Sequence, residues 1–244
     1  TDSQTPASST TPDTDAPTSD SAVSGITPPE QNPAPADTGH IWNAGLWDNA
    51  TRRAAAQQLF ALWERDYPSA PENIAHAAAE AGLSVLERRG SLATLRKLNR
   101  PAILVLHDDG GRRRFATLTG LDAAHAVVSF AEHIFRIKST ELVKHWRGDF
   151  ILLWQPPPDY STPVYPGHEG EMVTWLDQKL AVIHERPPAG ETRPVLGGTL
   201  LDELRQFQAA NGLTPDGILG PVTLIHLHNA TGGTYPRLQS DTHI

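Results

Sequence analysis

The sequence predicts a two-domain chain, with an α+β domain over residues 40–156 and a small all-α domain over residues 160–230. Three observations lead to this prediction. Helical patterns are followed by short apolar runs and a hairpin signal, which is typical of an α+β domain. Three prolines, Pro156 to Pro158, then end the β pattern, because proline cannot continue a central strand. After them the apolar residues recur only at helical spacing.

The first 39 residues have the composition of a linker. Residues 1–38 contain seven prolines, many Ser and Thr, six acidic side chains and no Lys or Arg. Such a stretch buries too little apolar area to offset the entropy lost on ordering, so we expect residues 1–39 to be disordered. Removing their six charges from the formal net charge of −8 leaves −2, and no basic patch indicates nucleic acid as a partner.

Several classes of chemistry are excluded or disfavoured. The chain has no cysteine, so it has no disulfide, thiolate zinc site or cysteine nucleophile. It has no His-Glu-x-x-His motif, and its one close histidine pair, His226 and His228, would face different ways on a helix. Gly-x-Ser-x-Gly is also missing, as is any apolar run long enough to cross a bilayer. We therefore expect no metal and no cofactor.

The α+β domain is predicted to begin with three helices. The first covers residues 48–67, and the second begins at a capping box, with Ser69 as N-cap and Glu72 reaching back, and ends at Gly82. Ser91 caps the third, which ends before Asn99. A helix over 139–146 is also expected. The predicted strands are 83–86, 103–106, 115–121, 126–130, 134–137 and 150–154, with a hairpin turn at 109–111.

The second domain has three helical segments. The first two carry apolar residues three or four positions apart, and Asn211-Gly212 predicts a left-handed stop after the second. Gly217 suits a turn position with positive φ, and Pro221 the first turn of a third helix. The apolar positions are Val173, Leu176 and Leu180; Leu200, Leu204 and Phe207; and Leu224 and Leu227.

These segments resemble the peptidoglycan-binding domain 1 family. The resemblance lies in Val173-x-x-Leu176-x-x-x-Leu180, in Leu204-x-x-Phe207-Gln208-x-x-x-Gly212-Leu213 and in Asp216-Gly217-Ile218-Leu219-Gly220-Pro221-x-Thr223. It implies a three-helix bundle that binds peptidoglycan without cleaving it. Many members have an Asp-Gly-x-Phe-Gly turn before the second helix, where this chain has residues 195–199, so the first half of a ligand groove differs here.

Four residues of the closing signature are candidate peptidoglycan contacts: Asp216, Gly217, Gly220 and Thr223. Each also has a structural interpretation. Asp216 suits a turn that it organises, and Thr223 can form a hydrogen bond near the start of a helix. The two glycines suit positions where the backbone requires glycine.

The strand Arg114-Phe115-Ala116-Thr117-Leu118-Thr119-Gly120-Leu121 resembles the His-Phe-Val-Val-Leu-Thr-Gly strand of the peptidase C39-like, papain-type family. The family's catalytic histidine is replaced by Arg114. A guanidinium is not a general base near neutral pH, and the chain has no thiol for it to activate. The resemblance therefore implies an inactive peptidase domain that serves as a scaffold.

Together, the two domains resemble the periplasmic region of the general secretion pathway protein A (ExeA-type) family. This resemblance implies a parent protein with a cytoplasmic ATPase and one membrane span, tethered to the inner membrane by a segment N-terminal to this chain. The implied partners are peptidoglycan, secretion protein B, the type II secretin and a homo-oligomer. The alternative hypothesis is a cell-wall hydrolase or peptidase with an attached peptidoglycan-binding domain. Arg114 and the absence of cysteine favour the non-catalytic protein.

Overall fold

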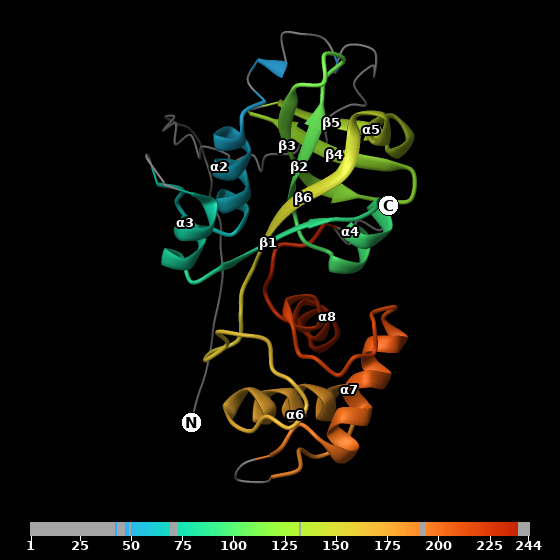
Figure 1. The fold of residues 1–244 in the computed structure, drawn as a ribbon. Helices are drawn as coiled ribbons and strands as arrows, with labels where there is room; N and C mark the ends of the chain where they lie inside the picture. The colour runs from blue at the N-terminus through green and yellow to red at the C-terminus, as the bar shows by residue number, and fades with distance from the viewer. Residues whose placement is uncertain are drawn as a thin grey trace, which may run out of the picture. The chain divides into compact units, whose positions relative to one another are not determined.

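The fold is described from a computed structural model of the chain (Figure 1). The described residues are 42, 47, 48, 50–68, 73–131, 133–190 and 194–238. The expected linker of residues 1–39 lies outside them. The described residues form one compact unit. Among the described residues, no helix has the length and apolar character needed to span a bilayer.

A six-stranded sheet forms the centre of the α+β part, and all five strand pairs are antiparallel. The strands follow the order β1-β6-β2-β3-β4-β5, so the last strand in sequence lies between β1 and β2. The expected strands are all present, each with slightly different ends. They are β1 (Ser84–Arg89), β2 (Ala102–His107), β3 (Arg113–Leu121), β4 (His125–Phe130), β5 (His133–Lys138) and β6 (Trp146–Trp154).

Four helices in the described ranges accompany the sheet, and side chains define where three of them begin. Thr51 accepts a hydrogen bond from the backbone of the first helix, and Ser91 forms a capping box with Thr94, as expected for that residue. The helices are α2 (Arg52–Leu62), α3 (Ile74–Glu80), α4 (Leu92–Leu98) and α5 (Ser139–His145).

The predicted start of α3 is wrong. Asn73 is its N-cap, and its side chain accepts a hydrogen bond from His76 N at 2.7 Å. The helix therefore begins at Ile74, after the segment that suggested a capping box. Ser69 and Glu72 themselves lie outside the described residues. Ser69 and Asn73 are both of residue types that favour the N-cap, and the spacing between Ser69 and Glu72 favours Ser69.

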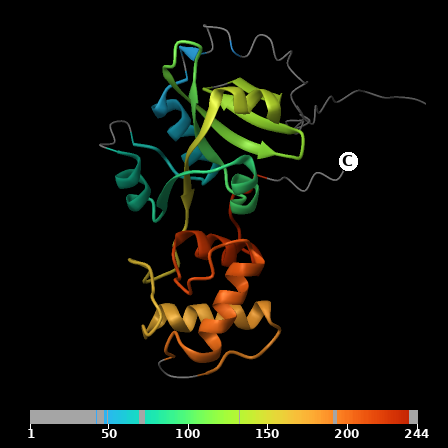
Figure 2. The ribbon, with the colours of Figure 1, turned by 45° about the vertical axis from the view of Figure 1, so that its right-hand side comes forward.

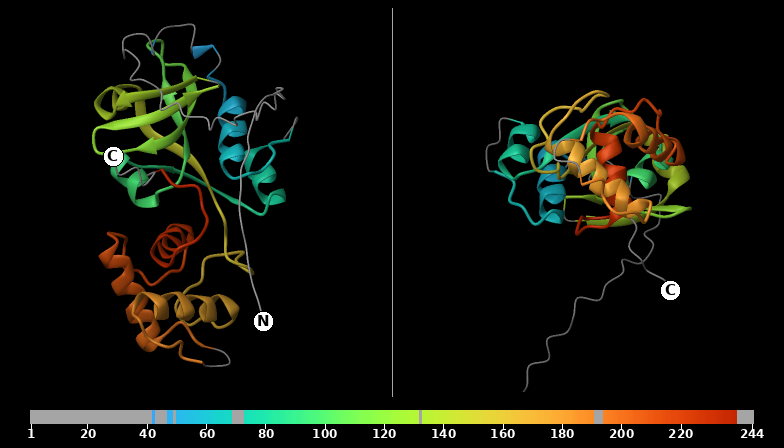
Figure 3. Two further views of the ribbon diagram at one scale, coloured as in Figure 1. Left: turned by 180° about the vertical axis from the view of Figure 1, so that it is seen from behind. Right: turned by 90° about the horizontal axis from the view of Figure 1, so that it is seen from below.

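Helices cover both faces of the sheet because its central strands alternate between two apolar clusters. Ile103 and Ile151 pack with α2 and α3, whereas the neighbouring Leu104 and Leu152 pack in the cluster that includes α4 and α5. Figures 1 and 3 show the two helix pairs on opposite sides of the sheet. This double coverage explains the continuous apolar runs in β2 and β6.

The helical part consists of α6 (Glu171–Ile183), α7 (Gly198–Ala210) and α8 (Pro221–Thr231) (Figure 2). The predicted apolar stripes form its core. Gly212 has a φ of +70°, which confirms the left-handed stop after α7. Together with the sheet domain, these helices confirm the predicted fold class of an α+β domain followed by an all-α domain. Within the three helices, the fully buried leucines are Leu176, Leu180, Leu204, Leu224 and Leu227.

The loops before α7 and α8 are built alike, although only the second carries the family turn. Leu219 exchanges backbone hydrogen bonds with Val164, while Leu196 bonds to Gly167 and His168. Both leucines are fully buried. The sequence of residues 195–199 thus departs from the family turn. It still places a buried leucine, Leu196, directly before Gly197, the N-cap of α7.

The α+β part and the helical part contact each other through α4 and α8. The Asn229 amide donates to the Lys97 and Leu98 carbonyls, each at 3.2 Å. Arg100 is 1% exposed, and burial lowers its pKa to about 10. It donates to Asn229 Oδ1 at 2.6 Å and lies 4.8 Å from the Tyr235 ring centroid. Arg100 has no ion pair with a carboxylate of the described residues.

The segment after α8 returns to the α+β part. The sequence predicts a C-terminal tail over residues 231–244, but Leu238 is buried, and its backbone N–H donates to Asn99 Oδ1 at 3.0 Å. Its carbonyl accepts a hydrogen bond from Leu121 N at the end of β3. The division of the chain at residues 156–160 stays a prediction, because one apolar cluster includes side chains from both parts.

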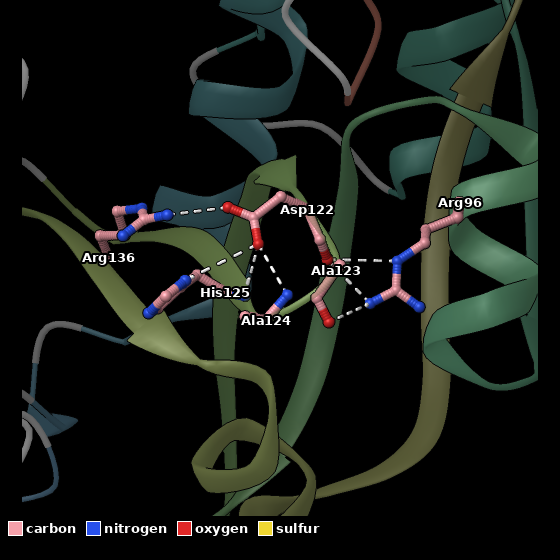
Figure 4. A network of polar contacts seen from close by, with 6 residues as sticks. All are labelled: Arg96, Asp122, Ala123, Ala124, His125 and Arg136. Atoms are coloured by element: carbon pink, nitrogen blue, oxygen red, sulfur yellow. Dashed lines mark hydrogen bonds and ion pairs between the residues drawn. The ribbon is translucent and has the colours of Figure 1, made fainter. Parts of the chain in front are cut away.

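Asp122 organises the turn between β3 and β4 (Figure 4). Its Oδ1 accepts from the backbone N–H groups of Ala124 and His125, and its Oδ2 from Arg136 Nη2 at 2.8 Å. Arg96 on α4 donates to the Asp122 carbonyl at 2.8 Å. Burial alone would raise the pKa of the Asp122 carboxyl, but the donated hydrogen bonds outweigh it and lower the pKa. The network therefore ties α4 to the sheet.

Candidate functional site

Gln208, on α7, is the centre of the closing signature of the helical part. Its side chain is 1% exposed. The amide Nε2 donates to Asp216 Oδ1 at 3.0 Å and to the Ile218 carbonyl at 3.1 Å, while Oε1 accepts from Gly217 N at 2.9 Å. One buried amide thus supplies hydrogen bonds that the backbone of the following turn lacks.

Asp216 and Thr223 both belong to this network. Asp216 Oδ1 also accepts from Ile218 N at 2.9 Å, and Thr223 Oγ1 lies 3.3 Å from Gln208 Nε2 and donates to the Ile218 carbonyl at 3.4 Å. Their structural interpretations therefore hold: Asp216 organises the turn, and Thr223 forms a hydrogen bond near the start of α8. Asp216 is also exposed, and its Oδ2 has no hydrogen-bond partner among the described residues. Direct contact with peptidoglycan stays a prediction for both.

The two glycines differ from each other. Gly217 has a φ of +73°, and a Cβ there would lie 2.5 Å from Leu201 Cδ1, so the fold requires glycine. Gly220 is the N-cap of α8 in an extended conformation, with a φ of −101° and open space where a Cβ would lie. The interpretation of Gly220 as a backbone requirement is therefore wrong.

A cleft of about 500 Å³ opens beside this network. Asp216, Thr223 and Gln208 line one side, whereas Gly217 and Gly220 do not line it. The α+β part lines the other side through the end of β1 and through α4. Its residues there are Arg88, Arg89, Ala93, Thr94, Lys97 and Leu98.

The cleft carries positive charge. Arg88, Arg89 and Lys97 face one carboxylate, Asp216. His226 also lines it, but burial, together with the nearby cations Lys97 and Arg100, lowers its pKa to about 4, so it is neutral near pH 7. The lining therefore sums to about +2, in a chain whose net charge is −8.

The three cations are held differently. Lys97 Nζ donates to the Asn211 carbonyl at 3.2 Å, at the C-terminal end of α7, and Arg89 Nε donates to the Arg147 carbonyl at 2.9 Å. Arg88 is exposed, and its guanidinium makes no hydrogen bond or ion pair within the part of the chain that the structure describes. It is therefore available to an incoming anion.

Arg114, which the family resemblance matches to the peptidase histidine, makes structural contacts. Its Nε donates to Asp108 Oδ2 at 3.2 Å, and its Nη1 donates to the Trp47 carbonyl at 2.9 Å. The pKa of Asp108 is lowered, first by the Arg112 N–H and further by Arg114, and burial opposes this shift. The ion pair joins the start of β3 to the turn after β2, and the hydrogen bond to Trp47 joins it to the segment before α2.

The histidine pair does not form a metal site with other ligands. Within the described ranges, no group of three or more His, Cys, Asp or Glu side chains is placed to hold a metal ion. The His226 ring lies near Asn211 Oδ1 at 3.4 Å, while the His228 ring stacks on Tyr235 with centroids 5.1 Å apart. The two rings therefore have different neighbours.

Residues 169–227 match the family described as "Putative peptidoglycan binding domain". The chain is 30% identical over 189 residues to general secretion pathway protein A of Aeromonas hydrophila, an alignment that covers 78% of this chain and 34% of that protein. The resemblance to general secretion pathway protein A is confirmed. The chain thus spans about a third of the length of this relative.

Two solved structures are also similar to the chain. A periplasmic domain of the EpsAB fusion protein of the Vibrio vulnificus type II secretion system superposes with a TM-score of 0.53 and 22% identity, covering 80% of this chain and 85% of that one. The N-terminal peptidase C39 like domain of a toxin secretion ATP-binding protein from Vibrio parahaemolyticus covers 43% of this chain, with a TM-score of 0.35 and 20% identity. The first similarity shows that the two parts share their fold with the EpsAB domain.

The sequence alone did not reveal the cleft or the structural role of the Gln208 amide. The position of Gln208 did indicate burial, because a polar residue four positions after Leu204 lies on the buried stripe of α7. No sequence pattern indicated a role for Arg88 or Lys97, since exposed cations on a strand and a helix are common. Their position opposite Asp216 arises only when the two parts pack together.

Proposed function

We propose that this chain binds peptidoglycan in the cleft between α4 and the turn before α8, and does not cleave it. The observation that carries the proposal is the match of residues 169–227 to a peptidoglycan-binding family, with Asp216 and Thr223 lining a cleft of about 500 Å³. Such a cleft has the size of a typical small-ligand site. Asp216 Oδ2 is an acceptor for an N–H group of the bound wall.

Two facts support a non-catalytic role. The chain has no cysteine, so the nucleophile of the C39 family is missing. Arg114 is held by Asp108 and the Trp47 carbonyl, and it stays protonated near neutral pH. In the family resemblance Arg114 takes the place of the peptidase histidine, and a protonated guanidinium cannot accept a proton.

We further propose a place for the chain in type II secretion. Similarity to an EpsAB domain described as periplasmic supports a periplasmic location. The family resemblance further implies a tether to the inner membrane and an ATPase elsewhere in the parent protein. Similarity to a protein described as an EpsAB fusion supports secretion protein B as a partner. By holding the wall, the chain would help to place the secretin through it, alone or as a homo-oligomer.

Co-sedimentation of the full chain with purified sacculi tests wall binding. We expect the wild-type chain to pellet with sacculi and Asp216→Asn to pellet less, because the variant replaces a carboxylate that lines the cleft. Asp202→Asn, an exposed change on α7, is the matched control and should behave as wild type. Muropeptides in the supernatant should not exceed those of a buffer control. A wild-type chain that stays in the supernatant would refute binding, and released muropeptides would support a hydrolase.

A further inference from the structure

We propose that Arg88, assisted by Lys97, binds a carboxylate of the peptidoglycan stem peptide, so that the α+β part forms half of the wall-binding site. This proposal rests on the proposed function, since it names the group of the wall that enters the cleft. It also gives the peptidase-like part a role in recognition beyond that of a scaffold.

The register of β1 brings Arg88 to the cleft. Side chains two positions apart on a strand share a face, so Arg88 lies on the same face as Leu86. Leu86 packs against the apolar cluster that also contains Leu98 of α4 and Leu224 of α8. Arg88 is the next residue on this face of β1, beyond its apolar part, and it lines the cleft on the side opposite Asp216.

Lys97 adds a second cation that the fold holds in place. It reaches across to the Asn211 carbonyl, and a Cβ at Gly212 would lie 2.5 Å from its Nζ. Lys97 Nζ therefore lies at the end of α7, across the contact between the two parts. Arg88, with no partner among the described side chains, has its full hydrogen-bonding capacity available to a ligand.

The chemistry of the wall selects the stem peptide as the ligand. The sugars of the glycan strand are neutral, and the lactyl carboxyl of the muramic acid is used in the amide bond to the peptide. Free carboxylates are therefore found on the stem peptide, beside amide N–H groups and, in walls with a diamino acid, an ammonium. A guanidinium matches the planar geometry of a carboxylate, and Asp216 Oδ2 is available to the N–H groups. Both kinds of partner line one cleft.

The test is titration of the full-length chain with a soluble disaccharide-peptide muropeptide, followed by calorimetry. We expect Arg88→Gln to bind roughly tenfold more weakly than wild type, and Arg88→Glu to bind more weakly still. Arg53→Glu is the matched control for Arg88→Glu. Arg53 is exposed in the first turn of α2 and does not line the cleft, so this variant should bind as wild type. Circular dichroism of each variant would show that it is folded.

A second ligand isolates the carboxylate. When the stem-peptide carboxylates are converted to amides, wild type and Arg88→Gln should bind equally, because the interaction that the variant removes is then absent from both. The proposal would be overturned if Arg88→Gln bound the unmodified muropeptide as tightly as wild type does. It would also be overturned if the variant lost the same factor of affinity for the unmodified and the amidated muropeptide. In either case binding by the wild-type chain would leave the proposed function standing, whereas no binding by the wild type would refute the proposed function itself.

Discussion

Replacing Gln208 by methionine tests the hydrogen-bond network that shapes the turn before α8. The two side chains have similar volume and flexibility, so the variant keeps the packing of α7 and removes only the amide. Gln208 Oε1 accepts the hydrogen bond of the buried Gly217 N–H, and Nε2 donates to the Ile218 carbonyl. Without the amide, the N–H of Gly217 is left without its partner.

The magnitude follows from these contacts. A buried donor left unpaired costs about 1–3 kcal/mol. The loss at the Ile218 carbonyl is smaller, because Thr223 Oγ1 still donates to it at 3.4 Å. We therefore expect Gln208→Met to lower the free energy of unfolding by roughly 2–4 kcal/mol.

Equilibrium urea unfolding, followed by far-ultraviolet circular dichroism, measures this change. Gln206→Met is the matched control, since Gln206 is exposed on the same helix, and it should shift stability by less than about 0.5 kcal/mol. A Gln208→Met chain as stable as wild type would refute the view that this amide shapes the turn. In sacculus sedimentation, the folded variant should also bind less, because Asp216 loses one of the two bonds that orient it.

Three further predictions concern other parts of the chain. Burial lowers the pKa of His228 from 6.5 to about 4, so between these values the unfolded chain binds the extra proton and stability falls with falling pH. His228→Phe should reduce this slope by about 1.4 kcal/mol per pH unit in urea titrations, and an unchanged slope would contradict a buried, neutral His228 ring. Leu204→Ala should cost about 2–5 kcal/mol of stability, whereas Val182→Ala, at a residue 62% exposed, should cost little; equal melting temperatures would contradict a core role. Arg114→His should cleave no labelled peptide above the wild-type background, because the chain still lacks a thiol nucleophile.

Local chemistry made much of the fold predictable. Ser91 and Gly212 mark the ends of helices through side-chain and backbone preferences that act over a few residues, and both behave as predicted. The start of α3 shows where this reasoning fails. Two acceptable N-cap residues, Ser69 and Asn73, lie four positions apart, and only Asn73 is used among the described residues.

The order of the sheet and the composition of the cleft depend on contacts distant in sequence. Ser84 of β1 pairs with Trp154 of β6, and no local pattern encodes that pairing. Likewise, Arg88 and Lys97 meet Asp216 only through the packing of α4 against α8. The candidate residues on the helical side could therefore be found from the sequence, whereas those on the α+β side could not.

The central position of β6 affects how a nascent chain reaches this fold. Among the described strands, β1 pairs only with β6. It therefore stays unpaired until residues 146–154 have been made, while β2 to β5 can already form a meander with an open edge at β2. An open edge strand invites pairing with the wrong chain. Such non-local pairing also slows folding, since the intervening loop must close first. β6 therefore sets both the rate of completion and the interval during which the growing chain is vulnerable to aggregation.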